Sequence, residues 1–343
     1  MIHRPVLGAD PDRNRRLLQE VLDTVPPGKL ELPPGTHALA DGLRVPGGWT
    51  VRGSEVAGAN GGPPGTWLGS TGTTGHPVLH IVGSDVSVSD LGLRPPPADP
   101  GEHGGDRGTA ITVGDYLYPG TPEWISGVDL RRVHVERPEE KHANCIAIMG
   151  AVRDLTVHDV TIRGGYTGVA VHWGAVGADV STIEGPTYHP HRLTITDLRV
   201  TDAIEGFYLS SVHDVRVEGA CLRGVEMGFR LLPGDNTDRF VTSSEHVSSA
   251  IDISGVCVSW HGPRYAVRVA GWGRSEVDGL VSVLRYRDTA IRDCTLRGTG
   301  TGDAWSPILV ERAEGVALHD IIASSNHPTE PGACCRVAAK PSV

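Results

Sequence analysis

The chain of 343 residues has few lysines and no long hydrophobic run. Its only lysines are Lys29, Lys141 and Lys340, so arginine supplies nearly all of the positive charge. The formal net charge is −10 with histidine neutral, and no basic stripe is present, which argues against a nucleic-acid partner. No stretch reaches the ~18 consecutive apolar residues that a membrane-spanning helix needs, so we expect no membrane association.

Several signatures of targeting and cofactor binding are also missing. The N-terminal residues contain no apolar segment like the core of a signal peptide, so we expect a cytoplasmic protein, or a secreted one if the sequence is that of a mature form. The sequence has no glycine-rich phosphate loop, dinucleotide fingerprint or GxSxG elbow. We therefore expect no cofactor.

None of the six cysteines belongs to a CxxC pair. Four of them lie singly within or beside strand patterns, where we expect small buried thiols: Cys145, Cys221, Cys257 and Cys294. Cys334 and Cys335 are adjacent, and we expect no structural role for them.

Glycine, in contrast, is abundant, with 45 residues that recur at the ends of short β-branched runs. The second apolar run of successive units aligns on Ile146, Val169, Phe207, Phe229, Val267 and Ile308. These positions are 23, 38, 22, 38 and 41 residues apart. A period near 22, lengthened by insertions at one place in the unit, is typical of a solenoid. Because the units are strands, the sequence predicts a parallel β-helix.

The alternation of side chains along a strand then predicts which residues face outward. The aligned positions face the core, and the next position in each run faces out: Ala147, Ala170, Tyr208, Arg230, Arg268 and Leu309. A slip of one residue would bury Arg230 and Arg268, which supports this register. Rungs stack about 4.8 Å apart, so Tyr208, Arg230 and Arg268 should form a ladder with His172 one rung away.

Aspartate recurs at equivalent corners of the first run of each unit, at Asp159, Asp197, Asp214, Asp293 and Asp320. Aspartate favours turns because its carboxylate bonds to the nearby backbone. We therefore interpret these residues as turn formers and exclude them from the site.

The N-terminal segment carries a resemblance to a known family. Residues 8–25 are predicted to form a helix capped by Asp10 or Asp12. Two strand-turn segments follow, KLELPPGTHAL and GLRVPGGWTVRG. A GADP helix followed by LxLPPGxHxL and LxVPxGxTVRG resembles the entry to the pectate-lyase-like superfamily of right-handed parallel β-helices. The resemblance implies that the helix caps the open end of the solenoid, and that the protein forms a homotrimer.

We accordingly expect an all-β chain with one domain of roughly ten rungs. Its parts are an N-terminal cap over residues 1–30, a right-handed parallel β-helix over 31–325 and a loose tail over 326–343.

The predicted ladder has the groups for one kind of chemistry. A tyrosine or histidine base beside an arginine is suited to removing the proton α to a carboxylate, because the arginine neutralises the developing enolate. We therefore assign catalytic roles to Tyr208, His172 and Arg230, and substrate binding to Arg268. The predicted function is that of a lyase or epimerase acting on a uronate-containing saccharide.

Two insertions, 174–190 and 233–248, leave the end of the same strand and should wall the ladder into a groove. From this region we assign one further catalytic residue, Asp235, and the substrate-binding residues Trp173, Glu184, Tyr188, His189, His191 and Asp238. Trp173 either stacks on a sugar ring or packs within its loop. Histidines with Glu184 would also suit zinc, but HPH is not a recognised ligand spacing, and we expect no metal.

Three other functions fit the same fold. Carboxylates among Asp235, Asp238, Glu184 and Glu205 would suit a glycoside hydrolase or an intramolecular fructosyl transferase. The lack of an export signal favours a cyclase or isomerase that acts on a small specialised metabolite. The fourth function is that of a non-catalytic structural or binding β-helix, against which the unequal, histidine-rich loops argue.

Overall fold

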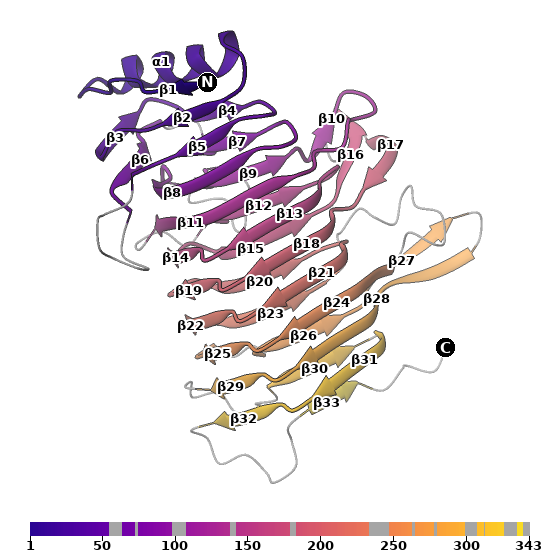
Figure 1. Ribbon diagram of the computed structural model, residues 1–343. Helices are drawn as coiled ribbons and strands as arrows, with labels where there is room; N and C mark the ends of the chain where they lie inside the picture. The colour runs from indigo at the N-terminus through magenta and orange to yellow at the C-terminus, as the bar shows by residue number, and fades with distance from the viewer. Residues whose placement is uncertain are drawn as a thin grey trace.

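The solenoid begins beneath a single described helix, α1 (Pro11–Thr24), which lies across its N-terminal end (Figure 1). Asp10 is the N-cap, and its carboxylate accepts hydrogen bonds from the backbone N–H groups of Asp12 and Arg13 at 3.0 and 3.2 Å. Leu18 and Leu22 are buried against the first rungs. The helix therefore covers apolar core that the first rung would otherwise expose, as the resemblance implied.

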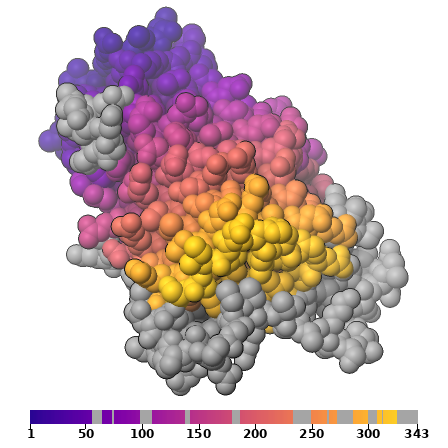
Figure 2. Space-filling view, turned by 60° about the horizontal axis from the view of Figure 1, so that its bottom comes forward, coloured from indigo at the N-terminus to yellow at the C-terminus, as the bar shows by residue number. Residues whose placement is uncertain are grey.

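This computed structural model describes residues 1–54, 64–72, 75–97, 108–137, 142–178, 183–232, 247–262, 265–277, 280–298, 307–311, 313–325 and 335–338. They form a single-domain, right-handed parallel β-helix, as predicted (Figure 1). In Figure 2 the last rungs, in yellow, face the viewer at the end of the solenoid opposite α1. Among the described residues, no helix has the length and apolar composition that a membrane crossing requires.

One long wall of the solenoid is a ten-stranded sheet. Its strands, in chain order, are β4 (Leu43–Val45), β7 (Leu79–Ile81), β9 (Ile111–Gly114), β12 (Ile146–Met149), β15 (Thr167–His172), β20 (Glu205–Leu209), β23 (Met227–Leu231), β26 (Val267–Ala270), β30 (Ile308–Glu311) and β33 (Cys335–Ala338). Neighbouring strands are parallel and hydrogen-bonded in this order.

The remaining walls form a twenty-stranded sheet, which bends around the core. It comprises β1 (Ile2–His3), β2 (Lys29–Glu31), β3 (Gly35–Leu39), β5 (Thr50–Arg52), β6 (Thr66–Ser70), β8 (Ser87–Arg94), β11 (Val128–Arg137), β13 (Arg153–His158), β14 (Thr161–Gly164), β18 (His191–Thr196), β19 (Arg199–Thr201), β21 (His213–Glu218), β22 (Cys221–Val225), β24 (Val247–Ser254), β25 (Cys257–Trp260), β27 (Trp272–Val277), β28 (Leu280–Arg292), β29 (Thr295–Gly298), β31 (Glu314–His319) and β32 (Ile322–Ser325). A separate three-stranded sheet joins β10 (Leu117–Tyr118), β16 (Gly174–Gly177) and β17 (Ile183–Tyr188).

The register predicted from the repeat is confirmed at every rung of the alignment. The paired series runs through Ile146, Val169, Phe207, Phe229, Val267 and Ile308, and all six side chains are buried. The rings of Phe207 and Phe229 stack with their centroids 4.7 Å apart. The wall therefore consists of columns of equivalent residues, one from each rung.

A column of glycines precedes three of the six aligned inward runs. Gly168, Gly206 and Gly228 occupy successive rungs, where the backbone passes close to the next strand. A Cβ atom on Gly206 would lie 2.6 Å from both the carbonyl oxygen of Gly228 and Cδ1 of Leu222. A larger residue would separate these rungs, so glycine is needed at these three positions.

All but one of the aspartate corners have the predicted turn role. The φ angles of Asp159, Asp197, Asp214, Asp293 and Asp320 lie between 50° and 54°. This left-handed region is tolerated better by aspartate and asparagine than by most other residues. Asp159, Asp197, Asp293 and Asp320 each follow the last residue of a strand and turn the backbone at a corner. Asp214 instead lies within β21, opposite Arg192 of β18, so its placement at an equivalent corner was wrong.

The prediction of a loose tail over 326–343 is wrong for four residues. Cys335–Ala338 form β33, which pairs in parallel with β30. Without β33, the N–H and C=O groups along that edge of β30 would be left without a strand partner. The rest of the tail lies outside the described residues.

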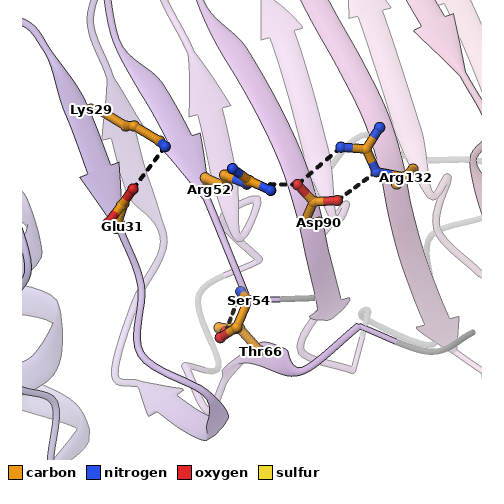
Figure 3. A network of polar contacts seen from close by, with 7 residues as sticks. All are labelled: Lys29, Glu31, Arg52, Ser54, Thr66, Asp90 and Arg132. Atoms are coloured by element: carbon orange, nitrogen blue, oxygen red, sulfur yellow. Dashed lines mark hydrogen bonds and ion pairs between the residues drawn. The ribbon is translucent and has the colours of Figure 1, made fainter. Parts of the chain in front are cut away.

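A buried ion pair ties together three rungs near the N-terminal end (Figure 3). Asp90 on β8 has a side chain only 2% exposed, and it lies between Arg52 on β5 and Arg132 on β11. Nε of Arg52 donates to the carboxylate at 2.9 Å, and Nε and Nη2 of Arg132 donate at 2.5 and 3.1 Å. Burial alone would raise the pKa of Asp90, but the two arginines outweigh it and the pKa is lowered.

Replacing this carboxylate should destabilise the fold. Asp90→Asn keeps the shape and tolerates the φ of 58°, but removes the negative charge that the two guanidinium groups share. We expect the free energy of unfolding in urea to fall by about 3 kcal/mol. Because the pKa of Asp90 is lowered in the folded state, the loss should be full near neutral pH and shrink as the pH falls through that pKa.

The matched control is Asp154→Asn. Asp154 also has a positive φ, 52°, and binds Arg192 through both oxygens, but its side chain is 45% exposed. This exposed pair should contribute less than about 1 kcal/mol. Equal losses from the two substitutions would contradict a special role for burial at Asp90.

Candidate active site

The predicted polar ladder exists on the outer face of the ten-stranded sheet. Tyr208 on β20 pairs in register with Arg230 on β23, which pairs in turn with Arg268 on β26. His172 ends β15, the preceding strand of the sheet. The three ladder residues are partly exposed, whereas the residues on either side of each in its strand are buried. Four residues assigned from the sequence are therefore brought together.

The side chain of Tyr208 contacts both Arg230 and His172. The guanidinium carbon of Arg230 lies 4.4 Å from the ring centroid of Tyr208, within the range of a cation–π contact. On the other side, the imidazole of His172 packs edge-on against the same ring, with centroids 4.9 Å apart. Tyr208 thus lies between a titratable imidazole and a fixed positive charge.

A fully buried carboxylate holds Arg230 in this position. Glu205, at the start of β20, is 0% exposed. Its Oε1 accepts from Nη1 of Arg230 at 3.1 Å, and its Oε2 accepts from Oγ1 of Thr167 at 3.3 Å. Burial would lower the pKa of Arg230, but the charge of Glu205 and the proximity of Tyr208 outweigh this, and the pKa is raised. The guanidinium therefore stays protonated.

Glu205 was considered from the sequence only as a hydrolase carboxylate, and its link to Arg230 was missed. The alignment of the rungs did contain a signal for this contact. The in-register neighbours of Glu205 are Thr167 and Met227, neither of which is charged. A charged residue among uncharged neighbours on a wall needs a partner nearby. Arg230, one rung on, is the cation within reach.

Arg268 extends the site by one more rung. Its Nη2 donates to Oε2 of Glu311 on β30 at 3.2 Å, and both side chains are about one-third exposed. Unlike Glu205, Glu311 is open to solvent. Arg268 is therefore the more accessible of the two cations in the ladder.

The carboxylates described on this face do not form a hydrolase pair. Glu205 and Glu311 lie on strands three rungs apart, a separation of about 14 Å along the sheet. Glycoside hydrolases need their two carboxyl groups about 5–9.5 Å apart. This pair therefore does not support glycoside hydrolysis.

Trp173 does not face a substrate groove. Its side chain is 1% exposed and packs on Tyr116, with ring centroids 4.8 Å apart. The insertion after β15 folds as the hairpin β16–β17, which pairs with β10 and encloses the indole. The interpretation of Trp173 as a sugar-stacking residue is wrong, and the alternative of loop packing is confirmed.

The remaining loop aromatics form a cluster around the same hairpin. Tyr188 contacts Tyr118 and Trp124 at 5.8 and 5.9 Å between ring centroids, and His191 contacts Trp124 at 4.8 Å. His189 faces His213 on β21, with Nδ1 and Nε2 3.1 Å apart. The sequence placed Tyr188, His189 and His191 beside the ladder. The structure instead directs these contacts to the hairpin and the twenty-stranded sheet.

Three assigned carboxylates lie beyond what the structure describes. Glu184 belongs to β17, but its side chain is outside the described residues, as are Asp235 and Asp238 altogether. Their assignments stay predictions. Within the described residues, no group of three or more His, Cys, Asp or Glu side chains is arranged to hold a metal ion.

A second polar pair occupies the outward column nearer the N-terminus and was missed from the sequence. His80 on β7 is in register with Arg44 on β4. Its Nε2 lies 2.9 Å from the carbonyl oxygen of Gly114 and 3.2 Å from Oδ1 of Asp115. Burial lowers the pKa of His80, but Asp115 and the carbonyl outweigh it and the net shift is upward. Extending the alignment two units towards the N-terminus would have found it.

The fold also identifies structural relatives. No family model and no curated protein matches the sequence. The adhesin PfbA of Streptococcus pneumoniae is similar, with a TM-score of 0.53, 11% identity, and coverage of 93% of this chain and 96% of the other. The fold is that of the right-handed parallel β-helix proteins. An N-terminal fragment of bacteriophage Phi29 gene product 12 matches at a TM-score of 0.51 and 12% identity, covering 90% of this chain and 55% of the fragment.

Enzymes with this fold are similar at a lower level. An exopolygalacturonase from Thermotoga maritima has a TM-score of 0.48 and 10% identity, covering 91% of this chain and 87% of the enzyme. At these identities the likeness concerns the fold alone. The comparisons therefore concern the β-helix fold, and the activity of the chain has to be argued from its own residues.

The geometry predicts that Glu205 contributes more to the stability of the fold than Glu311 does. Glu205→Gln should lower the free energy of unfolding in urea by about 3 kcal/mol, because it removes one partner of a buried pair. Glu311→Gln, which alters the exposed pair with Arg268, should lower it by less than about 1 kcal/mol. A Glu205→Gln protein as stable as the parent would show that Arg230 does not depend on this carboxylate.

Proposed function

We propose that the protein acts on a uronate-containing saccharide by removing the proton α to the carboxylate, as a lyase or an epimerase. The observation that carries the proposal is the contact of Arg230 with the ring of Tyr208, held from behind by buried Glu205. A permanent cation beside a phenol and an imidazole matches the charge changes of this reaction.

The proposed step assigns one role to each group. Tyr208 or His172 takes the proton from the carbon next to the carboxylate, and the electron pair moves into the carboxylate as an enolate. Arg230 lies where it offsets negative charge on the phenolate or the enolate, and Arg268 binds a substrate carboxylate from the next rung. Loss of the neighbouring glycosidic oxygen then gives an unsaturated sugar, whereas return of a proton to the opposite face gives the epimer.

With Tyr208 as the group that takes the proton, the phenolic oxygen is essential. Tyr208→Phe keeps the ring beneath Arg230 but cannot transfer a proton, so kcat should fall by about 10²–10⁴-fold with little change in KM. The measurement is the continuous near-UV absorbance of the unsaturated product across a panel of uronate-containing glycans, with NMR of the sugar configuration for an epimerase.

The control is Arg199→Ala, on β19 of the twenty-stranded sheet, where an exposed ion pair with Asp159 is lost. Its activity should equal that of the parent. If Tyr208→Phe retains full activity on a glycan that the parent converts, Tyr208 is not the acid–base group. Binding of such glycans without conversion would instead support the non-catalytic alternative.

A further inference from the structure

Two cysteines lie on the outside of the solenoid, where the sequence predicted buried thiols. Cys221 on β22 is partly exposed and Cys257 on β25 is exposed. The next residue in each strand, Leu222 after Cys221 and Val258 after Cys257, is buried in the core. The strand pattern thus placed these cysteines in strands correctly but assigned them to the wrong face.

The two thiols occupy adjacent rungs of the same column. Cys221 and Cys257 are register partners in parallel strands, so their side chains leave the same face about 4.8 Å apart. A disulfide needs its Cβ atoms about 3.8 Å apart, which would require the rungs to close by about 1 Å. With the zinc–sulfur length of about 2.3 Å as a guide, one metal ion placed in line between two sulfurs spans about 4.6 Å, close to the spacing that the register imposes.

The third cysteine of this region faces away from the pair. Cys294 is buried, and its Sγ donates to the carbonyl oxygen of Arg292 at 3.2 Å. Burial is the main cause of its raised pKa, which keeps it a thiol. A metal-binding thiol must lose its proton, so the outward pair offers two sulfur ligands and not three.

We propose that Cys221 and Cys257 together bind one Cu(I) ion in a two-coordinate site. Soft thiolate ligands select this ion over harder divalent cations. On binding, each thiol releases its proton to solvent and each sulfur forms one bond to copper, whose oxidation state does not change. The complex carries one negative charge. Arg199 is the register partner of Cys221 on the preceding rung, and its guanidinium pairs with Asp159.

The test is anaerobic titration of the reduced protein with Cu(I) in competition with bicinchoninate. All variants carry Cys334→Ser and Cys335→Ser, because those adjacent thiols would also bind copper. The parent should take up one ion per chain. Cys221→Ser and Cys257→Ser should each weaken binding by at least about 100-fold. Cys294→Ser should leave it unchanged, and circular dichroism should show the same fold throughout.

A variant in which the cysteine pair is moved by one rung tests whether binding depends on the spacing of the pair or on Cys221 itself. Thr295 on β29 is exposed and is the register partner of Cys257 on the other side. Combining Thr295→Cys with Cys221→Ser and Cys294→Ser moves the pair by one rung and should restore binding. The proposal is overturned if either single serine variant binds copper as tightly as the parent, if the rebuilt pair stays empty, or if the parent forms a Cys221–Cys257 disulfide that takes up no copper.

Discussion

The in-register stacking of parallel strands determines the rest of this structure. Each rung places its residues directly over the equivalents of the rung before, about 4.8 Å away. An apolar residue therefore meets an apolar residue, as Phe207 meets Phe229, and an outward side chain is next to outward side chains. The candidate active site is one such outward column, so its geometry depends on the same register that builds the core.

In a stacked wall, a buried charge destabilises the fold unless a neighbouring rung supplies the counter-charge. Asp90 meets this requirement with arginines from the rungs on both sides, and Glu205 meets it with Arg230 from the next rung. The two cases differ in consequence. The arginines that bind Asp90 are themselves 38% and 46% exposed, whereas Glu205 fixes a guanidinium that also contacts the ring of Tyr208. A buried carboxylate thereby positions a residue of the proposed active site.

The sequence predicted the fold and the ladder because both follow from the period and the alternation of side chains. Tyr208, Arg230 and Arg268 could be placed for that reason, without knowledge of any contact. The loops carry no period, so Trp173, Tyr188 and His191 were assigned to the ladder although they pack around the β16–β17 hairpin. The role of Glu205 was missed because a pattern of strands does not show which neighbouring cation a buried carboxylate binds.

Isotope exchange would show whether this column removes a proton next to a carboxylate. The protein would be incubated in D2O with a uronate-containing glycan, and the deuterium at the carbon α to the carboxylate would be measured by NMR and mass spectrometry. For an epimerase the account predicts deuterium at that carbon in the product. For a lyase it predicts a slower reaction when that carbon already carries deuterium. Turnover that shows neither effect would contradict proton abstraction and leave the ladder without its proposed chemistry.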